Sequence, residues 1–122
     1  MLEIKNLHAK VADTEILHGI DVTFEKGKNT CILGKNGSGK SSLAMAVMGH
    51  PSYEVKSWML KAKSESEEID ILELDPHERA KLGIFVAFQT IPEIKGVKLF
   101  EFLRSIYNAT TGQNSSFIQF KK

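Results

Sequence analysis

The residues with the clearest chemical potential run from Gly34 to Ser41. They read Gly-Lys-Asn-Gly-Ser-Gly-Lys-Ser and match the pattern G-x-x-x-x-G-K-[ST] at every position. Glycines allow backbone N–H groups to turn inward and let an anion approach closely. Lys40 supplies a positive charge for β- and γ-phosphates, and the Ser41 hydroxyl is suited to a magnesium ion. The stretch therefore predicts a phosphate-binding loop.

The neighbouring segments have the order that such a loop needs. Residues 29–33 predict a short buried strand, and residues 42–48 predict a helix that Gly49 closes. A helix that begins near Gly39 would point its free N–H groups and its dipole at the same anion. Strand, glycine loop and helix together favour nucleotide binding over a glycine-rich turn without a ligand.

Composition limits the function classes. The chain has 122 residues, a formal net charge of +1 and 25% charged residues, which indicates one domain at most and no nucleic-acid partner. It has no apolar run near the roughly 18 residues of a membrane span, and residues 1–5 lack the apolar core of a signal peptide. The single cysteine, Cys31, excludes an internal disulfide, fits a reducing cytoplasm and is expected to be buried in a strand. A cytoplasmic protein without direct membrane insertion is expected.

The segments before and after the loop predict a mixed architecture. Apolar residues alternate with polar ones over 2–11 and 15–24, which predicts an antiparallel β ribbon ahead of the loop. Residues 58–62 predict a further strand, and the acidic residues 64–68 predict a solvated loop.

Further along the chain, Asp75, Pro76 and Glu78 form a helix start with a capping box, and that helix is expected to stop at Gly83. The run 84–88 is apolar at every position, as in a strand covered on both faces, and it ends at Gln89.

A second helix is predicted from about Lys98. Its apolar stripe contains Leu99, Phe102, Leu103 and Ile106. Phe100 and Tyr107 lie off this stripe, so either they insert into a partner's groove or they pack inside a larger domain. The segment 108–116 is rich in Thr, Ser, Asn and Gly and predicts a loop within a polar tail, 108–122.

Together these features resemble an ABC-type ATPase, and within that superfamily the chain is most similar to SufC, the ATPase subunit of the Suf iron–sulfur cluster assembly system. The phosphate loop is specific only to the superfamily, whereas the stretches at 49–55 and 85–103 are narrower signals. The residues that carry the resemblance lie in segments 1–8, 15–17, 34–42, 49–51, 53–55, 72–80, 88–89, 93–94, 96–97 and 101–103.

The resemblance implies an α/β P-loop NTPase fold of ABC type, with an N-terminal antiparallel β ribbon and an incomplete nucleotide-binding core. It implies ATP and Mg²⁺ as cofactors, with Ser41 and the Q-loop residue Gln89 directed at the metal and Gln89 also at the attacking water. Suf scaffold proteins would dock on residues 89–107, and the full-length family dimerises through ATP. The implied nucleotide-binding residues are Gly34, Lys35, Asn36, Gly37, Ser38, Gly39, Lys40, Ser41 and Ser42.

The departures from the family pattern define what else is expected. Lys35 stands where the family usually has proline and Ser42 where it has threonine; neither change breaks the loop. The 122 residues contain no apolar run ending in Asp-Glu, no Leu-Ser-Gly-Gly signature and no downstream switch histidine. The resemblance thus covers about the N-terminal half of the family's domain, over residues 1–107, and ATP binding without efficient hydrolysis is expected.

Three other functions stay open at this point. They are the nucleotide-binding subunit of a membrane transporter, a non-catalytic nucleotide-binding or interaction module, and a degenerate or incomplete gene product without a stable fold. A P-loop kinase is disfavoured by the antiparallel ribbon and by the glutamine after residues 84–88.

Overall fold

A computed structural model describes residues 1–57, 59–63, 68–90 and 93–120. The expectations for Trp58, for residues 64–67 and 91–92, and for the last two residues of the tail lie outside this range. The chain divides into two compact units, Met1–Val86 and Ala87–Lys122, and each is described by itself.

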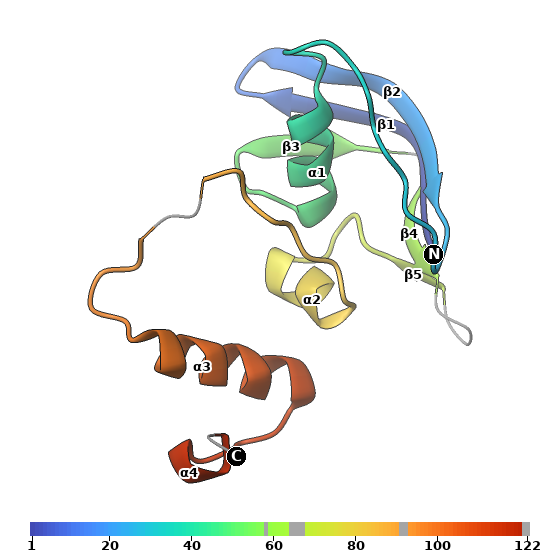
Figure 1. Cartoon of the computed structure of the whole chain (residues 1–122). Coiled ribbons are helices and arrows are strands. Elements are labelled where there is room, and N and C mark those ends of the chain that lie inside the picture. The colour runs from blue at the N-terminus through green and yellow to red at the C-terminus, as the bar shows by residue number, and fades with distance from the viewer. Residues whose placement is uncertain (58, 64–67, 91–92, 121–122) are drawn as a thin grey trace. The chain divides into compact units, whose positions relative to one another are not determined.

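The first unit contains a five-stranded antiparallel sheet and two helices (Figure 1). β1 is central: it pairs with β2 on one side and with both β3 and β4 on the other, and β4 pairs in turn with β5. The bounds are β1 Leu2–Val11, β2 Thr14–Phe24, α1 Lys40–Met48, β3 Tyr53–Lys56, β4 Met59–Lys63, β5 Glu68–Asp70 and α2 Pro76–Lys81. The predicted ribbon is confirmed, whereas β3 and β5 were not predicted.

A bulge explains why the apolar pattern of β1 is not strictly alternating. The register passes from the pair Ile4 and Val22 to the pair Leu7 and Ile20, so β1 carries one extra residue. Asn6 has a positive φ of 50° there, and its N–H donates to Asp21 Oδ1 at 2.7 Å. Ile4 and Leu7 therefore both face the core although three positions separate them.

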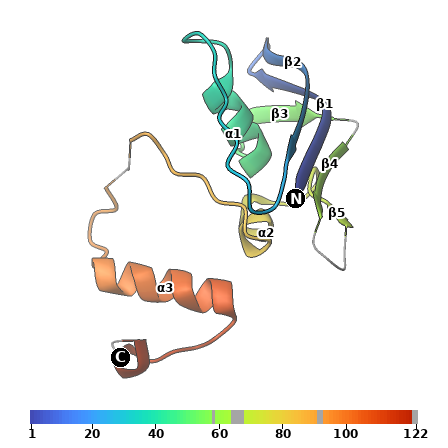
Figure 2. The ribbon, with the colours of Figure 1, turned by 45° about the vertical axis from the view of Figure 1, so that its right-hand side comes forward.

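Helix α1 covers one face of the sheet, as both views of the ribbon show (Figures 1 and 2). Its buried residues pack against apolar side chains of β1, β2 and β4. The buried core consists of Ile4, Leu7, Ala9, Leu17, Leu43, Ala46, Val47, Leu60 and Ile71. This packing fixes α1, and with it the start of the helix after the glycine loop.

Two strand predictions were wrong. Segments 29–33 and 84–88 form no strand in the structure, and the described residues offer neither of them a paired neighbour. Leu33 is 87% exposed, Phe85 is 65% exposed, and Cys31 is exposed rather than buried. The physical reason is that an extended apolar segment becomes a strand only when a neighbouring strand takes its N–H and C=O groups.

The predicted start of α2 is confirmed. Asp75 precedes the helix, Pro76 occupies its first turn, and the N–H of Asp75 donates to Glu78 Oε2 at 2.9 Å. This is the capping box that the sequence predicts. The helix ends at Lys81, and Gly83 follows with a positive φ of 87°.

The second unit consists of an irregular segment and two helices, α3 Leu99–Thr111 and α4 Phe117–Phe120. The loop expected from Asn108 begins later, because α3 continues to Thr111 before Gly112 ends it. No helix among the described residues is long and apolar enough to cross a lipid bilayer.

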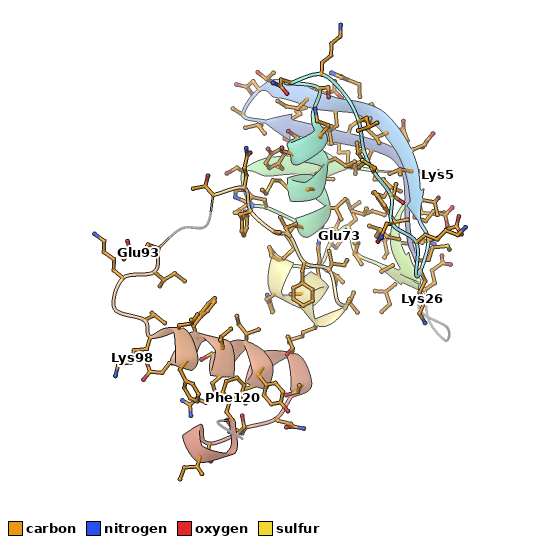
Figure 3. The ribbon with its side chains drawn as sticks, in the orientation of Figure 1. Lys5, Lys26, Glu73, Glu93, Lys98 and Phe120 are labelled. Carbon is orange, nitrogen blue, oxygen red and sulfur yellow. The ribbon has the colours of Figure 1, made fainter. Side chains whose placement is uncertain are left out.

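Phe120 contacts both aromatic residues that lie off the apolar stripe of α3. Its ring centroid lies 5.3 Å from that of Phe100 and 5.4 Å from that of Tyr107, and Figure 3 labels Phe120 beside α3. Tyr107 stays 39% exposed beside this neighbour. Insertion into a partner's groove and packing inside a larger domain both stay predictions for the two rings. The stripe of Leu99, Phe102, Leu103 and Ile106 is exposed as well.

The ribbon also carries an acid-sensitive pair. His8 Nδ1 lies 2.6 Å from Glu15 Oε1, and His18 Nδ1 lies 3.5 Å from the other carboxylate oxygen. The hydrogen bond with His8 lowers the pKa of Glu15 below its usual value of 4.5. Because the folded state then favours the ionised carboxylate, this stabilisation is present above about pH 4.5 and is lost as the pH falls through the lowered pKa.

We expect the free energy of unfolding to fall on acidification below about pH 4.5, and the Glu15→Gln variant to show a smaller fall. Urea unfolding between about pH 3 and about pH 6 measures it. His8→Gln removes the larger contribution and leaves His18 in place, so it should reduce the fall by less than Glu15→Gln does, and the double variant should resemble Glu15→Gln. An unchanged acid dependence in both single variants would show that the pair contributes nothing.

Candidate functional site: the phosphate loop

The glycine loop lies at the N-terminal end of α1, at the end away from α2 (Figure 1). Gly39 is the residue before the helix, with φ at 88° and ψ at 6°, and Lys40 is the first helical residue. The N–H of Leu43 closes the first helical hydrogen bond on the Gly39 carbonyl at 2.8 Å. The free N–H groups of the first turn are therefore presented at the loop, as anion binding requires.

Lys40 is folded across the loop. Its ammonium donates to the Gly34 carbonyl at 2.7 Å, to the Lys35 carbonyl at 2.6 Å and to Ser38 Oγ at 3.4 Å. The Ser38 N–H donates to the Lys35 carbonyl at 3.2 Å, which closes a tight turn beneath it. The loop thus concentrates a cation and backbone donors in one place, and phosphate oxygens can replace the carbonyls as acceptors for Lys40.

Two glycines of the loop lie close to other side chains, and Gly39 also has a positive φ. A Cβ on Gly39 would lie 2.8 Å from Leu17 Cδ2, at a φ that side chains rarely adopt. A Cβ on Gly34 would lie 2.7 Å from Ser38 Oγ. Gly39 therefore packs the loop directly against β2, whereas a side chain at Gly34 would require the Ser38 hydroxyl to move.

The two serines after Lys40 differ in their surroundings. Ser41 is exposed on the first turn of α1, whereas Ser42 is half-buried and its Oγ accepts a hydrogen bond from the Tyr53 hydroxyl at 3.4 Å. Ser41 is thus the accessible hydroxyl, and this fits the predicted metal-directed role. Tyr53, at the start of β3, was not predicted to support the loop, since no local motif links it to residues 34–42.

An apolar cavity of about 380 Å³ lies beside α1. Residues of α1 line it together with the unpaired segments before and after, including Lys40, Leu43, Ile32 and Phe85. Lys40 of the phosphate loop therefore borders an apolar surface. This surface includes residues of segments 29–33 and 84–88, which the sequence predicts as strands.

Gln89 belongs to the second unit, and the loop belongs to the first. Gln89 is exposed at a bend after residues 84–88, so its predicted position at the end of a strand is not confirmed. Its role toward Mg²⁺ and water stays a prediction.

The described residues also contain no group of three or more His, Cys, Asp or Glu side chains that can hold a metal.

Comparison with known proteins decides the family. The sequence model of the ABC transporter family matches residues 17–117, which include most of β2, the loop and α3. The chain belongs to the ABC transporter family. Its fold is that of the ABC ATPase domain, as the sequence resemblance implied.

Curated relatives of this ABC ATPase chain carry similar names. A probable ATP-dependent transporter ycf16 of Cyanophora paradoxa is 45% identical over 108 residues, 88% of this chain and 40% of the relative. The ycf16 protein of Pyropia yezoensis is 46% identical over 109 residues, 89% of this chain and 42% of its own. A probable ABC transporter ATP-binding protein of Streptococcus pyogenes is 42% identical over 109 residues, which are 89% of this chain and 41% of the relative. The chain spans about two-fifths of the length of these relatives.

Proposed function

We propose that this chain is an ATP-binding part of an ABC-type ATPase and that it holds Mg·ATP at residues 34–42. The observation that carries the proposal is the position of Lys40, whose ammonium lies among the main-chain atoms of the loop at the N-terminal end of α1. This arrangement brings a fixed positive charge, backbone N–H groups and a helix dipole to one anion site.

Each part of the loop has a distinct task in this proposal. Lys40 neutralises charge on the β- and γ-phosphates, and the loop's N–H groups bind their oxygens. Ser41 contributes a hydroxyl to Mg²⁺, which itself supplies further charge neutralisation on the phosphates. Tyr53 supports the loop by a hydrogen bond to Ser42, and Leu17 supports it by packing against Gly39.

Calorimetric titration with ATP in the presence and absence of Mg²⁺ tests this function directly. Saturable binding of one ATP per chain, strengthened by Mg²⁺, is expected. GTP as a second titrant reports base selectivity, while inorganic phosphate shows what the phosphate groups contribute alone. A chain that remains folded and shows no binding of ATP would refute the proposal.

The finer proposal is that this ATPase works in the cytoplasm in Suf-type iron–sulfur cluster assembly. Its support is the resemblance of residues 49–55 and 85–103 to the Suf ATPase subunit, with residues 89–107 as the segment facing the scaffold. The names of the relatives favour a second candidate, the ATP-binding subunit of a transporter. The two candidates differ in the partner that the second unit contacts.

Cross-linking distinguishes the two partners. A photo-reactive residue at Lys95 or Leu103 should react with a Suf scaffold protein, because both positions are exposed in the second unit. The same residue at Lys28, on the turn after β2, is the control and should not react. Reaction with a membrane-embedded transporter subunit instead would favour the second candidate, and equal reaction at Lys28 would reject a specific contact.

A further inference from the structure

Arg79 is the charged side chain that is buried in the described core, with 3% of its surface exposed. Its guanidinium donates four hydrogen bonds. In all four the acceptor is a main-chain carbonyl and not a carboxylate. Burial lowers the pKa of Arg79, and the nearby charges of Asp75 and Glu73 oppose that shift. A buried cation placed this way fixes the backbone segments that surround it.

The first of those segments is the C-terminal end of α1. There the N–H groups of Gly49 and His50 already bind the carbonyls of Ala46 and Met45, at 3.1 and 3.0 Å. Arg79 Nη1 donates to the Val47 carbonyl at 2.8 Å and to the Ala46 carbonyl at 3.2 Å. It therefore supplies a donor to the Val47 carbonyl at the helix end and a second donor to the Ala46 carbonyl, which also accepts from Gly49.

The other segments join β5 to α2. Arg79 Nη2 donates to the Leu72 carbonyl and Nε to the Leu74 carbonyl, both at 2.8 Å. Glu73, between them, is labelled in Figure 3. The main-chain carbonyl of Arg79 also accepts from the Ile84 N–H at 3.1 Å, at the start of the apolar run 84–88. One residue thus holds the helix behind the phosphate loop, the segment before α2 and the chain that follows it.

Gly49 provides the space for this contact. A Cβ on Gly49 would lie 2.9 Å from Arg79 Cζ and 3.0 Å from Nε. Gly83 is a matched comparison, since it follows α2 with a φ of 87° and has no atom within 4 Å of its Cβ position. Alanine at either site strains the backbone, but only at Gly49 does it displace the guanidinium.

We infer that Arg79 is a positioning residue for the phosphate loop: by fixing α1 against the segment before α2, it sets the affinity of residues 34–42 for the phosphates of ATP. This inference rests on the proposed function. Arg79 binds the C-terminal end of α1, and the nine residues of the helix separate it from the loop by about 13 Å along the axis. Arg79 therefore does not reach the phosphates itself, and it acts through the position of the helix.

The test compares the affinity for Mg·ATP of the wild type with three full-chain variants, at a temperature where circular dichroism shows each to be folded. Gly49→Ala and Arg79→Lys should weaken binding about tenfold, within the usual range of about 5- to 150-fold for coupled sites. Lysine keeps the charge but lacks the planar fork that spans Val47, Leu72 and Leu74. Gly83→Ala should stay within about twofold of the wild type.

Hydrogen exchange supplies a readout that a purely structural role would not change. ATP should slow exchange of the Ile84 amide in the wild type and in Gly83→Ala, but much less in Gly49→Ala, when each variant is compared with and without ATP. Equal effects of the two glycine substitutions on affinity, or wild-type affinity in Arg79→Lys, would overturn this inference and leave the proposed function standing. Failure of the wild type to bind ATP would overturn the proposed function and the inference with it.

Discussion

Replacing Lys40 with alanine should weaken the binding of Mg·ATP roughly 10- to 100-fold. The substitution removes charge-assisted hydrogen bonds to phosphate, which are worth about 1.5–3 kcal/mol, and that range corresponds to the expected loss of affinity. The ammonium also holds the Gly34 and Lys35 carbonyls at 2.7 and 2.6 Å, so alanine loosens the loop as well. Calorimetric titration of both proteins under the same salt concentration measures the difference.

Lys35 provides the matched control, because it is a second lysine in the same loop. Its side chain is exposed, and the loop uses its main-chain carbonyl as an acceptor for Lys40 and for Ser38. Lys35→Ala removes the same formal charge but keeps that carbonyl, so affinity should fall by less than about threefold. Equal losses in the two variants would indicate general attraction of ATP to a basic loop and would remove the specific role of Lys40.

The loop could be predicted from sequence because its requirements are local. Glycines at fixed positions, a lysine and the start of a helix lie within a few residues of each other, and the structure places Lys40 and Gly39 accordingly. The capping box at Asp75 and Glu78 is equally local. The roles of Ser41 and Gln89 toward the metal stay predictions, since they depend on groups beyond the loop itself.

The features that the sequence did not predict depend on residues that are distant in sequence. The run 84–88 is apolar at every position, but a strand also needs a neighbour, and neighbours are not encoded locally. The bulge at Asn6 is fixed by a contact with Asp21, fifteen positions away. Arg79 resembles an ordinary polar residue of an exposed helix, because arginine is rarely buried. Its partners at Ala46 and Val47 lie more than thirty positions before it.

The second large effect concerns hydrolysis: this 122-residue chain should bind ATP yet release phosphate at well below about 0.1 s⁻¹, against a usual range for enzymes of about 1–10³ s⁻¹. Phosphoryl transfer to water needs positioned Mg²⁺, an oriented nucleophile and stabilisation of the spreading charge. Lys40 and Ser41 address the first need, and Gln89 is predicted to contribute to the second.

The remaining groups are missing from these residues. No apolar run ends in Asp-Glu to supply a metal-directed carboxylate and a general base, and a general base alone contributes typically about 10²–10⁴-fold. The resemblance to ABC ATPases places the third need on a signature loop from a second subunit, and residues 1–122 contain no such loop. Phosphate release by the purified chain is the measurement, with Lys40→Ala as the control for contaminating ATPases. Lys40-dependent turnover at about 0.1 s⁻¹ or faster would mean that the carboxylates and the signature loop are dispensable for hydrolysis.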